Sequence, residues 1–470
     1  MATAMSQTPT TDLAFTSLEE ETAVDSLQVT GTLPAWLTGA LVRVTPAKLE
    51  VGGRRLDHWF DGLAMLNRFG FVDGGVSYKS RFIRSRAYHE AQEGRILAGF
   101  ATDPCRSIFK RVQAIFSPDL TDNPNVNLAQ IGERYIAMTE TPMPIEFDPE
   151  TLETVGQVEY ADKLRAHLST AHPHHDPKRD ELVNYVARFS RVSEYVLYGL
   201  PAGGSKRRVI ARLPVERPAY MHAFGMSGRY LILSEYPLRV NPLKLAFSGK
   251  PFIENYAWDA ADGTRFQVID RETGELRGTY ETDAFFCFHH VNAFERDGEL
   301  LVDLIAYEDP SIIDSLYLNQ RGVRGSIPPT QLRRYRIDLD GGGVRWEQLA
   351  EGTVELPRID YGRCNARDYR FAYFTGTGEG AQWIDHLVKV DVGDGSRADW
   401  SEPGCHPGEP IFVRRPDASE EDDGVVLSVV LDAAAERSFL LVLDAASFAE
   451  LARAEAPHHI PSGFHGQYLR

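Results

Sequence analysis

Cysteine is scarce in this sequence. The 470 residues contain only Cys105, Cys287, Cys364 and Cys405, and no two of these form a CxxC pair. A disulfide framework needs several cysteines at regular short spacings, and a thiolate zinc site needs such pairs. The sequence therefore indicates neither, and it favours a reducing, cytoplasmic setting.

Long hydrophobic runs are also lacking. The most apolar stretches, Gly424–Leu431 and Ser438–Leu443, are far shorter than the roughly 20 residues that a membrane-spanning helix needs. Residues 1–25 carry acidic charge and have no apolar core of the kind found in signal peptides. We expect neither a transmembrane segment nor an export signal.

Positive charge is in short supply. The chain has 50 Lys and Arg against 67 Asp and Glu, which gives a net charge of −17. Binding to nucleic acid depends on an excess of cations that displace counterions from phosphates. We therefore expect no DNA or RNA partner.

Short runs of β-branched and aromatic residues recur between compact turns, whereas long amphipathic helical periods are rare. The clearest runs are Leu182–Phe189, Tyr230–Ser234, Leu300–Tyr307, Gly424–Leu431 and Ser438–Leu443. Glycine and proline are spread evenly, so no linker divides the chain. We predict an all-β fold with one domain over residues 26–470, preceded by an N-terminal tail of residues 1–25. A β-propeller is favoured because radial repetition leaves only short sheet edges, although the repeats are too degenerate to count blades.

One segment departs from the strand pattern. Cys105–Phe116 reads CRSIFKRVQAIF and places apolar residues at helical spacing, with Arg106, Lys110 and Arg111 between them. A basic amphipathic segment in an acidic protein suits a membrane interface, and it equally suits a helix that packs on the core.

Four of the fourteen histidines stand in apolar surroundings or at the ends of apolar runs. They are His172, His222, His289 and His465, separated by 50, 67 and 176 residues. In a propeller the innermost strands converge on the axis, so one histidine from each of four blades could meet there. Spacing alone is a weak signal for a metal site, because a lone histidine is more often a surface or hydrogen-bonded core residue.

The local sequences around these histidines are more specific. TAHPHHDP, YMHAFGM, FHHVNAFE and GFHG, in this order, resemble the four histidine motifs of the carotenoid cleavage oxygenase family. The similarity extends through DHWFDGLAML, TETPMPIEFDPETLETVGQV, FSGKPFIENYAW and EPIFVRRPDASEEDDGVVLSVV, and within the family it is strongest to the branch of β-carotene 15,15′-dioxygenases and the retinoid isomerohydrolase. The resemblance implies a seven-bladed β-propeller with a helical and loop cap over a non-haem Fe(II) on the axis.

The resemblance also assigns site residues by motif. It implies that His172, His222, His289 and His465 bind iron, and that the neighbouring His174, His175 and His290 do not. The positions that match the family's supporting glutamates are Glu140, Glu355 and Glu409, and Thr139 matches a threonine near the open coordination position.

Chemistry explains these residue types. Neutral imidazoles leave the charge of a divalent metal uncancelled, so carboxylates are needed to orient the rings and balance the charge. Four ligands on a six-coordinate iron leave two positions for O2. A polyene needs an apolar tunnel, and we expect its walls among aromatic residues near the motifs, each of which could instead pack in the core: Phe60, Phe109, Phe224, Tyr256, Trp258, Phe288 and Phe294.

The resemblance therefore predicts an Fe(II)-dependent dioxygenase that uses O2 to cleave a carotenoid, with the central 15,15′ bond of β-carotene as the first choice and retinal as the product. It also favours peripheral membrane contact through Cys105–Phe116. Alternatives are cleavage of apocarotenoids or stilbenes, a disfavoured isomerohydrolase activity, a zinc hydrolase, and a non-catalytic carotenoid-binding propeller.

Overall fold

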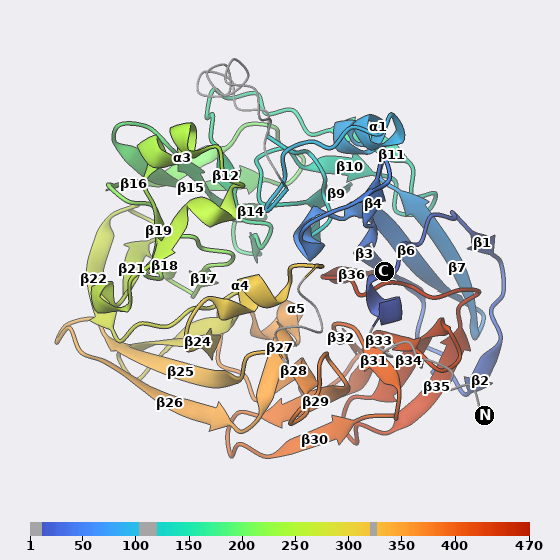
Figure 1. Cartoon of the computed structure of the whole chain (residues 1–470). Helices are drawn as coiled ribbons and strands as arrows, with labels where there is room; N and C mark the ends of the chain where they lie inside the picture. The colour runs from blue at the N-terminus through green and yellow to red at the C-terminus, as the bar shows by residue number, and fades with distance from the viewer. Residues whose placement is uncertain (1–11, 103–119, 320–326) are drawn as a thin grey trace, which may run out of the picture.

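The computed structural model describes residues 12–102, 120–319 and 327–470, and it is an all-β ring of seven blades (Figure 1). The predicted all-β propeller fold is therefore confirmed. All five predicted strand runs are strands, with ends that differ from the predicted ones by at most one residue.

Each blade is an antiparallel sheet whose innermost strand lies nearest the ring axis. The first blade contains β36 (Gly466–Leu469), β3 (Gly39–Lys48), β6 (Leu63–Val72), β7 (Gly75–Phe82) and β1 (Ala23–Val24). The second contains β8 (Asn127–Ile131), β9 (Arg134–Met138), β10 (Ile145–Phe147) and β11 (Thr154–Gln157). The third contains β12 (Leu168–Ser169), β13 (His174–Asp176), β14 (Glu181–Arg188), β15 (Ser193–Pro201) and β16 (Arg208–Val215).

The remaining blades follow in chain order. The fourth contains β17 (Gly225–Met226), β18 (Tyr230–Glu235), β21 (Thr264–Asp270) and β22 (Leu276–Thr282). The fifth contains β23 (His290–Arg296), β24 (Glu299–Tyr307), β25 (Thr330–Asp338) and β26 (Val344–Ala350). The sixth contains β27 (Thr353–Arg358), β28 (Phe371–Thr377), β29 (His386–Asp391) and β30 (Arg397–Trp400). The seventh contains β31 (Cys405–Pro407), β32 (Ile411–Arg414), β33 (Gly424–Asp432), β34 (Arg437–Asp444), β35 (Glu450–Glu455) and β2 (Val29–Gly31).

The two ends of the chain close the ring. Strand β36, near the C-terminus, pairs with β3 of the first blade, and β2, near the N-terminus, pairs with β35 of the seventh. Residues 12–25 belong to the predicted tail, yet they contact the propeller: β1 pairs with β7, and the buried Phe15 packs against Trp59 and Trp383.

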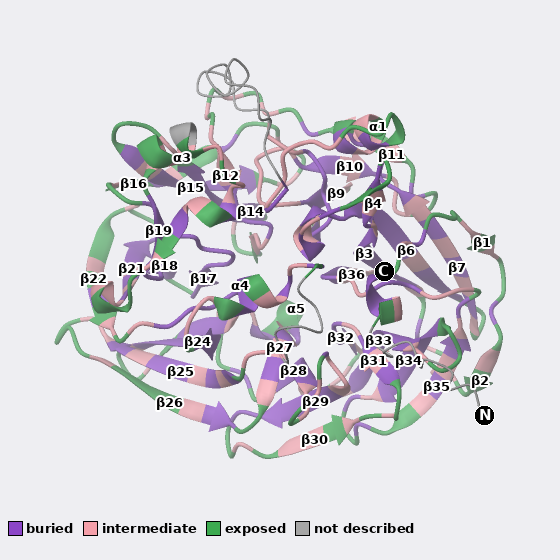
Figure 2. Ribbon diagram, in the orientation of Figure 1, coloured by how far each residue is buried: buried purple, intermediate pink, exposed green. Residues whose placement is uncertain are grey.

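The hydrophobic core lies mainly between neighbouring blades. Strand β33, for example, is buried on both faces because its blade is packed between two others. Figure 2 shows this burial through the middle strands, whereas outer strands such as β22 are largely exposed. The tight turn between β23 and β24 has Asp297 and Gly298 at φ values of 55° and 83°, the left-handed geometry that suits a two-residue hairpin.

Segments inserted between strands form the predicted cap. They carry the short pairs β4 (Glu50–Val51) with β5 (Arg54–Arg55) and β19 (Leu238–Val240) with β20 (Tyr256–Trp258). They also carry η2 (Trp59–Asp61), α1 (Arg86–Gln92), α3 (Pro242–Ser248), η3 (Ile253–Asn255), η4 (Ala260–Asp262) and α4 (Ser311–Ser315). Two short helices lie elsewhere, η1 (Asp12–Phe15) and α5 (Tyr361–Cys364).

Backbone hydrogen bonds join the inserted segments to one another. The Trp59 N–H donates to the Leu316 carbonyl at 3.1 Å, and the Ile253 N–H donates to the Phe100 carbonyl at 3.1 Å. Hydrogen bonds thus join the inserted segments of different blades into one layer over the ring. Within the described ranges, no helix is both long and apolar enough to cross a bilayer.

Candidate metal centre

Each of the four predicted histidines occupies the same kind of position in the fold. His289 and His465 immediately precede the innermost strands β23 and β36 of the fifth and first blades. His172 and His222 lie two or three residues before β13 and β17 of the third and fourth blades. Because innermost strands converge on the axis, this shared position brings four residues that are distant in sequence to one point.

The imidazole rings meet through their Nε2 atoms. The Nε2 atoms of His172 and His222 are 3.0 Å apart, and those of His289 and His465 are 3.2 Å apart. One ligand nitrogen from each of the four rings lies within 4.8 Å of all the others. His222, His289 and His465 are buried and His172 is half-buried, so little of the cluster's surface is exposed.

This donor set fits a single transition-metal ion. Imidazole nitrogens bind such ions at about 2.1 Å, so two neighbouring ligands at a right angle are about 3 Å apart. The observed Nε2 separations match that value. Four imidazoles without thiolate or carboxylate ligands suit iron, copper, nickel or zinc, and six-coordinate geometry would leave two positions free.

Three carboxylates hold the opposite nitrogens of three of these rings. His222 Nδ1 lies 2.7 Å from Glu140 Oε1, His289 Nδ1 lies 2.6 Å from Glu355 Oε2, and His465 Nδ1 lies 2.6 Å from Glu409 Oε1. Carboxylates accept and do not donate when ionised, so each ring carries its proton on Nδ1 and keeps the Nε2 lone pair for a metal. The three predicted glutamates are thus brought to their three histidines.

Burial disfavours the charged form of three of the four imidazoles, because it lowers the pKa of His172, His222 and His465. It lowers the pKa of His172 well below its ordinary value, with the neighbouring histidines adding to the effect, and it lowers the pKa of His465 to about 4. Burial alone would raise the pKa of Glu409, but the charge of Arg358 and the hydrogen bond from His465 outweigh it and lower that pKa to about 2. His172, His222 and His465 are therefore neutral nitrogen donors at neutral pH, and the neighbouring Glu355 and Glu409 are ionised.

Acid should destabilise the metal-free protein. Burial also lowers the pKa of His174 to about 4 and of His290 to about 3. Because the unfolded histidines bind protons near pH 6.5 and the folded ones do not, their stabilising contribution is complete above pH 6.5 and declines as the pH falls toward 4. His465 alone would contribute about 3 kcal/mol to this loss. Asp61 acts in the opposite direction, because burial raises its pKa to about 6.

The expected result is a urea midpoint of the chelator-treated protein that falls steadily between pH 6.5 and pH 4.5, measured by circular dichroism. A midpoint that is flat or rises over this range would contradict the assignment of neutral buried histidines.

The neighbouring histidines have other partners. His174 Nε2 lies 2.9 Å from the Phe224 carbonyl, His175 Nε2 lies 3.3 Å from Asp180, and His290 Nε2 lies 2.9 Å from the Ser234 hydroxyl. None of these three belongs to the cluster found among the described residues.

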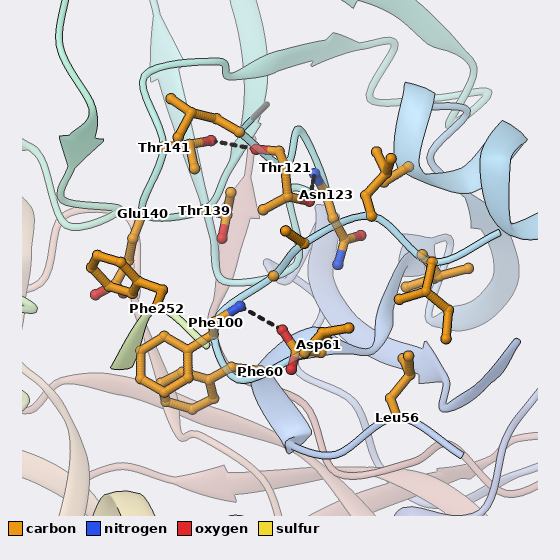
Figure 3. A pocket seen from close by; sticks show the side chains of 18 of the residues that line it. Leu56, Phe60, Asp61, Phe100, Thr121, Asn123, Thr139, Glu140, Thr141 and Phe252 are labelled. Atoms are coloured by element: carbon orange, nitrogen blue, oxygen red, sulfur yellow. Dashed lines mark hydrogen bonds between the residues drawn. The ribbon is translucent and has the colours of Figure 1, made fainter. Parts of the chain in front are cut away.

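Figure 3 shows an apolar cavity of about 190 Å³. It lies beside the metal centre, because Phe60 and Glu140 in its lining both contact His222. Thr139 and Glu140 border it on one side, and Phe60, Phe100 and Phe252 form an aromatic wall. The ring of Phe60 lies 6.2 Å from that of His222 and 4.9 Å from that of Phe100, so the wall reaches the cluster.

Several polar groups of this cavity are hydrogen-bonded to the backbone. Asp61 accepts hydrogen bonds from the N–H groups of Phe100 and Ala101 at 2.6 and 3.2 Å. The Thr141 hydroxyl donates to the Thr121 carbonyl at 2.7 Å, and the Asn123 amide donates to the Gly62 carbonyl at 2.8 Å. A hydrocarbon ligand would therefore leave few buried polar groups without partners.

A second cavity, of about 520 Å³, reaches the cluster by another route. His172, His289 and His465 line it, together with the polar residues Arg358 and Glu409. None of the histidines of the cluster borders the first cavity, and Phe60, Thr139 and Glu140 do not border the second. The metal centre thus lies between an apolar cavity and a second one with more polar lining, which we call the polar cavity.

The other aromatic residues expected in the tunnel are distributed differently. Phe288 packs on His222 at 5.1 Å, whereas Phe224 lines the polar cavity. Tyr256 belongs to a hydrophobic core cluster and the partly buried Trp258 packs against it, and neither residue borders either cavity. Phe294 packs between the fifth and sixth blades against Tyr369, 6.1 Å away, which is the core role that its sequence left open. Phe109 and the segment Cys105–Phe116 lie outside the described residues, and the membrane contact expected there stays a prediction.

Sequence reasoning missed several residues around the centre. Tyr220 and Tyr307 donate hydroxyl hydrogen bonds to Glu140 and Glu355, at 2.9 Å in each case, and Arg358 binds Glu409. Tyr220 precedes His222 by two residues, a spacing that could have indicated a shared direction. For the other two, contact depends on pairing between blades, and nothing local in the sequence indicates it.

Comparisons with known proteins agree with this geometry. The family model described as retinal pigment epithelial membrane protein matches residues 15–470. The mitochondrial carotenoid-cleaving dioxygenase of Mustela putorius furo is 34% identical, over 97% of this chain and 95% of that protein. The human β,β-carotene 15,15′-dioxygenase is 34% identical, over 94% of this chain and 91% of that protein.

Solved structures give the same result for the fold. The cobalt-substituted apocarotenoid oxygenase of Synechocystis superposes with a TM-score of 0.87 at 28% identity, covering 98% of each chain. The seven-bladed propeller fold is thus shared with a solved oxygenase.

Proposed function

The chain belongs to the family of the retinal pigment epithelial membrane protein and the carotenoid oxygenases, and from this membership we propose that it is an iron(II)-dependent dioxygenase that cleaves a conjugated double bond of a carotenoid. The observation that carries the proposal is the convergence of four imidazole Nε2 atoms beside an apolar cavity, with three Nδ1 atoms held by carboxylates.

The residues of this chain would hold the metal and keep it reactive. His172, His222, His289 and His465 would bind it, and Glu140, Glu355 and Glu409 would fix the tautomers of three rings and offset its charge. When bound, a ferrous ion with four imidazole ligands supplies redox chemistry and two coordination positions for O2.

The apolar cavity would hold the polyene. Phe60, Phe100 and Phe252 would exclude water from the reacting bond and pack on the flat chain of conjugated carbons. Thr139, which borders the cavity next to Glu140, is the proposed side chain nearest the open coordination position.

The reaction needs no side chain to act as an acid, a base or a nucleophile. One O2 molecule supplies one oxygen atom to each carbon of the double bond, the C=C bond breaks, and two carbonyl products form. Atoms and electrons balance without a reductant, and the side chains of Asp61, Asn123 and Thr141 in the cavity are already hydrogen-bonded to the backbone.

We place the cleaved bond at the centre of β-carotene, with retinal as the product. The support is the 34% identity to the human 15,15′-dioxygenase over almost the whole chain. A second candidate is cleavage of a shorter apocarotenoid, and the support is the structural match to the Synechocystis apocarotenoid oxygenase.

One experiment separates these candidates. The iron-loaded protein is incubated in air with β-carotene and with several apocarotenals, and the products are separated by chromatography. We expect retinal as the sole product from β-carotene. A pair of unequal fragments would move the cut away from the centre, and cleavage of the apocarotenals alone would favour the second candidate. Recovery of every substrate intact, or activity in a zinc-loaded sample without oxygen, would overturn the proposal.

A further inference from the structure

Strand β27 contributes two functional side chains, Glu355 and Arg358, to the centre on the ring axis. The two residues are three positions apart in the sequence. In a regular strand, residues i and i+3 point to opposite faces of the sheet. In β27, Glu355 pairs with Thr375 of β28 and Arg358 pairs with Tyr373, so β27 uses one residue more than β28 between these pairs. This extra residue is a β-bulge, and Leu356 within it has a φ of 52° in the left-handed region. The bulge lets Glu355 reach His289 while Arg358 reaches the next carboxylate, Glu409.

Arg358 binds Glu409 through both arms of its guanidinium. Nε donates to Glu409 Oε1 at 2.9 Å, and Nη2 donates to Oε2 at 3.1 Å and to the Gly466 carbonyl at 2.7 Å. Glu409 in turn accepts hydrogen bonds from His465 Nδ1 at 2.6 Å and from the Gly466 N–H at 2.9 Å. Arg358, Glu409 and the His465–Gly466 pair therefore form a closed unit.

This unit needs an arginine for two reasons. The Glu409 side chain is fully buried, and a buried carboxylate without a cationic partner is costly. The planar guanidinium also matches both carboxylate oxygens at once, which a lysine ammonium cannot do.

The other two carboxylates of the centre are supported by neutral groups. Glu140 is bonded by the Tyr220 hydroxyl and Glu355 by the Tyr307 hydroxyl. A second cation, Arg43, lies close by, but it donates to the backbone carbonyls of Glu409 and Phe464 and not to the carboxylate. Among the residues that the structure describes, Arg358 is thus the cation paired with a carboxylate that holds a cluster histidine.

We propose that Arg358 is a positioning residue that fixes Glu409 and His465 and, through its charge, favours a divalent metal over a trivalent one. This inference rests on the proposed function, since it concerns the same centre. Coulomb repulsion grows with the charge of the metal ion, so a fixed guanidinium disfavours a trivalent ion more than a divalent one. The guanidinium therefore acts in two separable ways. Its fork geometry positions Glu409 and His465, and its positive charge favours a divalent metal.

Two substitutions separate these contributions. Arg358→Lys keeps the charge and loses the fork, whereas Arg358→Gln loses both. A matched control is Arg207→Gln, because Arg207 holds Asp162 through the same two-armed contact, at 3.0 and 2.7 Å, in the third blade and borders neither cavity. The readouts are the Co(II) affinity and absorption spectrum, the rate at which bound Fe(II) is oxidised in air as followed by electron paramagnetic resonance, and the thermal unfolding of each metal-free variant.

We expect both Arg358 variants to alter the Co(II) spectrum, and Arg358→Lys to weaken Co(II) binding about tenfold, as is usual when a partner of a metal ligand is removed. Only in the Arg358→Gln variant should bound Fe(II) be oxidised faster than in the wild type, by about tenfold. Arg207→Gln should change the unfolding temperature alone. The inference would be overturned if both Arg358 variants had the Co(II) spectrum and the Fe(II) oxidation rate of the wild type. It would also be overturned if Arg207→Gln changed these two quantities as much as the Arg358 variants do.

The same samples test the proposed function separately. A wild-type protein that binds neither cobalt nor iron at the histidines would refute the proposed function. A wild-type protein that binds iron and cleaves carotenoid, with Arg358 variants that behave like it, would refute only the role of Arg358.

Discussion

Replacement of His289 by alanine should abolish iron binding and carotenoid turnover together. His289 supplies one of the four converging nitrogens, and its ring is held by Glu355 at 2.6 Å. Removing a partner of a metal ligand usually costs 10- to 100-fold in affinity. Loss of the ligand itself should therefore lower the affinity more than about 100-fold. The measurement is iron content by elemental analysis, together with retinal formation.

The adjacent residue provides a control of the same type. His290 follows His289 directly in the sequence, but its Nε2 lies 2.9 Å from the Ser234 hydroxyl and it is not part of the cluster. His290→Ala should keep iron occupancy close to that of the wild type. Equal loss of iron from both variants would show that the ligands are wrongly assigned.

A phenyl ring placed in the apolar cavity should stop turnover without removing the metal. Ala91 lies on α1, is buried, and lines this cavity. A packed interior does not admit both an added ring and a polyene, so Ala91→Phe should lower carotenoid cleavage at least about 100-fold. Iron content should be unchanged, because none of the four histidines borders this cavity.

The polar cavity offers the matched control. Ala129 on β8 lines that cavity, so Ala129→Phe introduces the same ring on the other side of the centre. It should change turnover by less than about threefold, an amount within the usual effect of a tolerated substitution. If Ala129→Phe is the variant that stops cleavage and Ala91→Phe is not, the substrate reaches the metal through the polar cavity.

Much of the fold was accessible from the sequence because its signals are local. The runs around β14, β18, β24, β33 and β34 alternate or concentrate β-branched residues between turn residues, and all are strands. The number of blades could not be predicted from local signals, because the repeats are too degenerate to count. The prediction of seven blades came from the family resemblance. Residues 12–25 contain too little sequence pattern to reveal that Phe15 is buried against Trp59 and Trp383.

Some residues of the candidate site could likewise be predicted from the sequence, whereas others could not. Histidine motifs are short and specific, so His172, His222, His289 and His465 could be named individually before any distance was known. Single aromatic residues carry no such signal, because the same side chain suits a tunnel wall and a core. Phe60 borders the apolar cavity, whereas Phe294 packs between blades against Tyr369.

The sequence by itself therefore determined the strand content and the identity of the residues that carry local motifs. Only the tertiary structure decided which groups distant in sequence face each other: Glu409 with Arg358, Glu355 with Tyr307, and Phe60 with Phe100. The physical reason is that strand formation depends on neighbouring residues, whereas contacts at the axis depend on how the blades close into a ring and how strands pair, as at the bulge of Leu356.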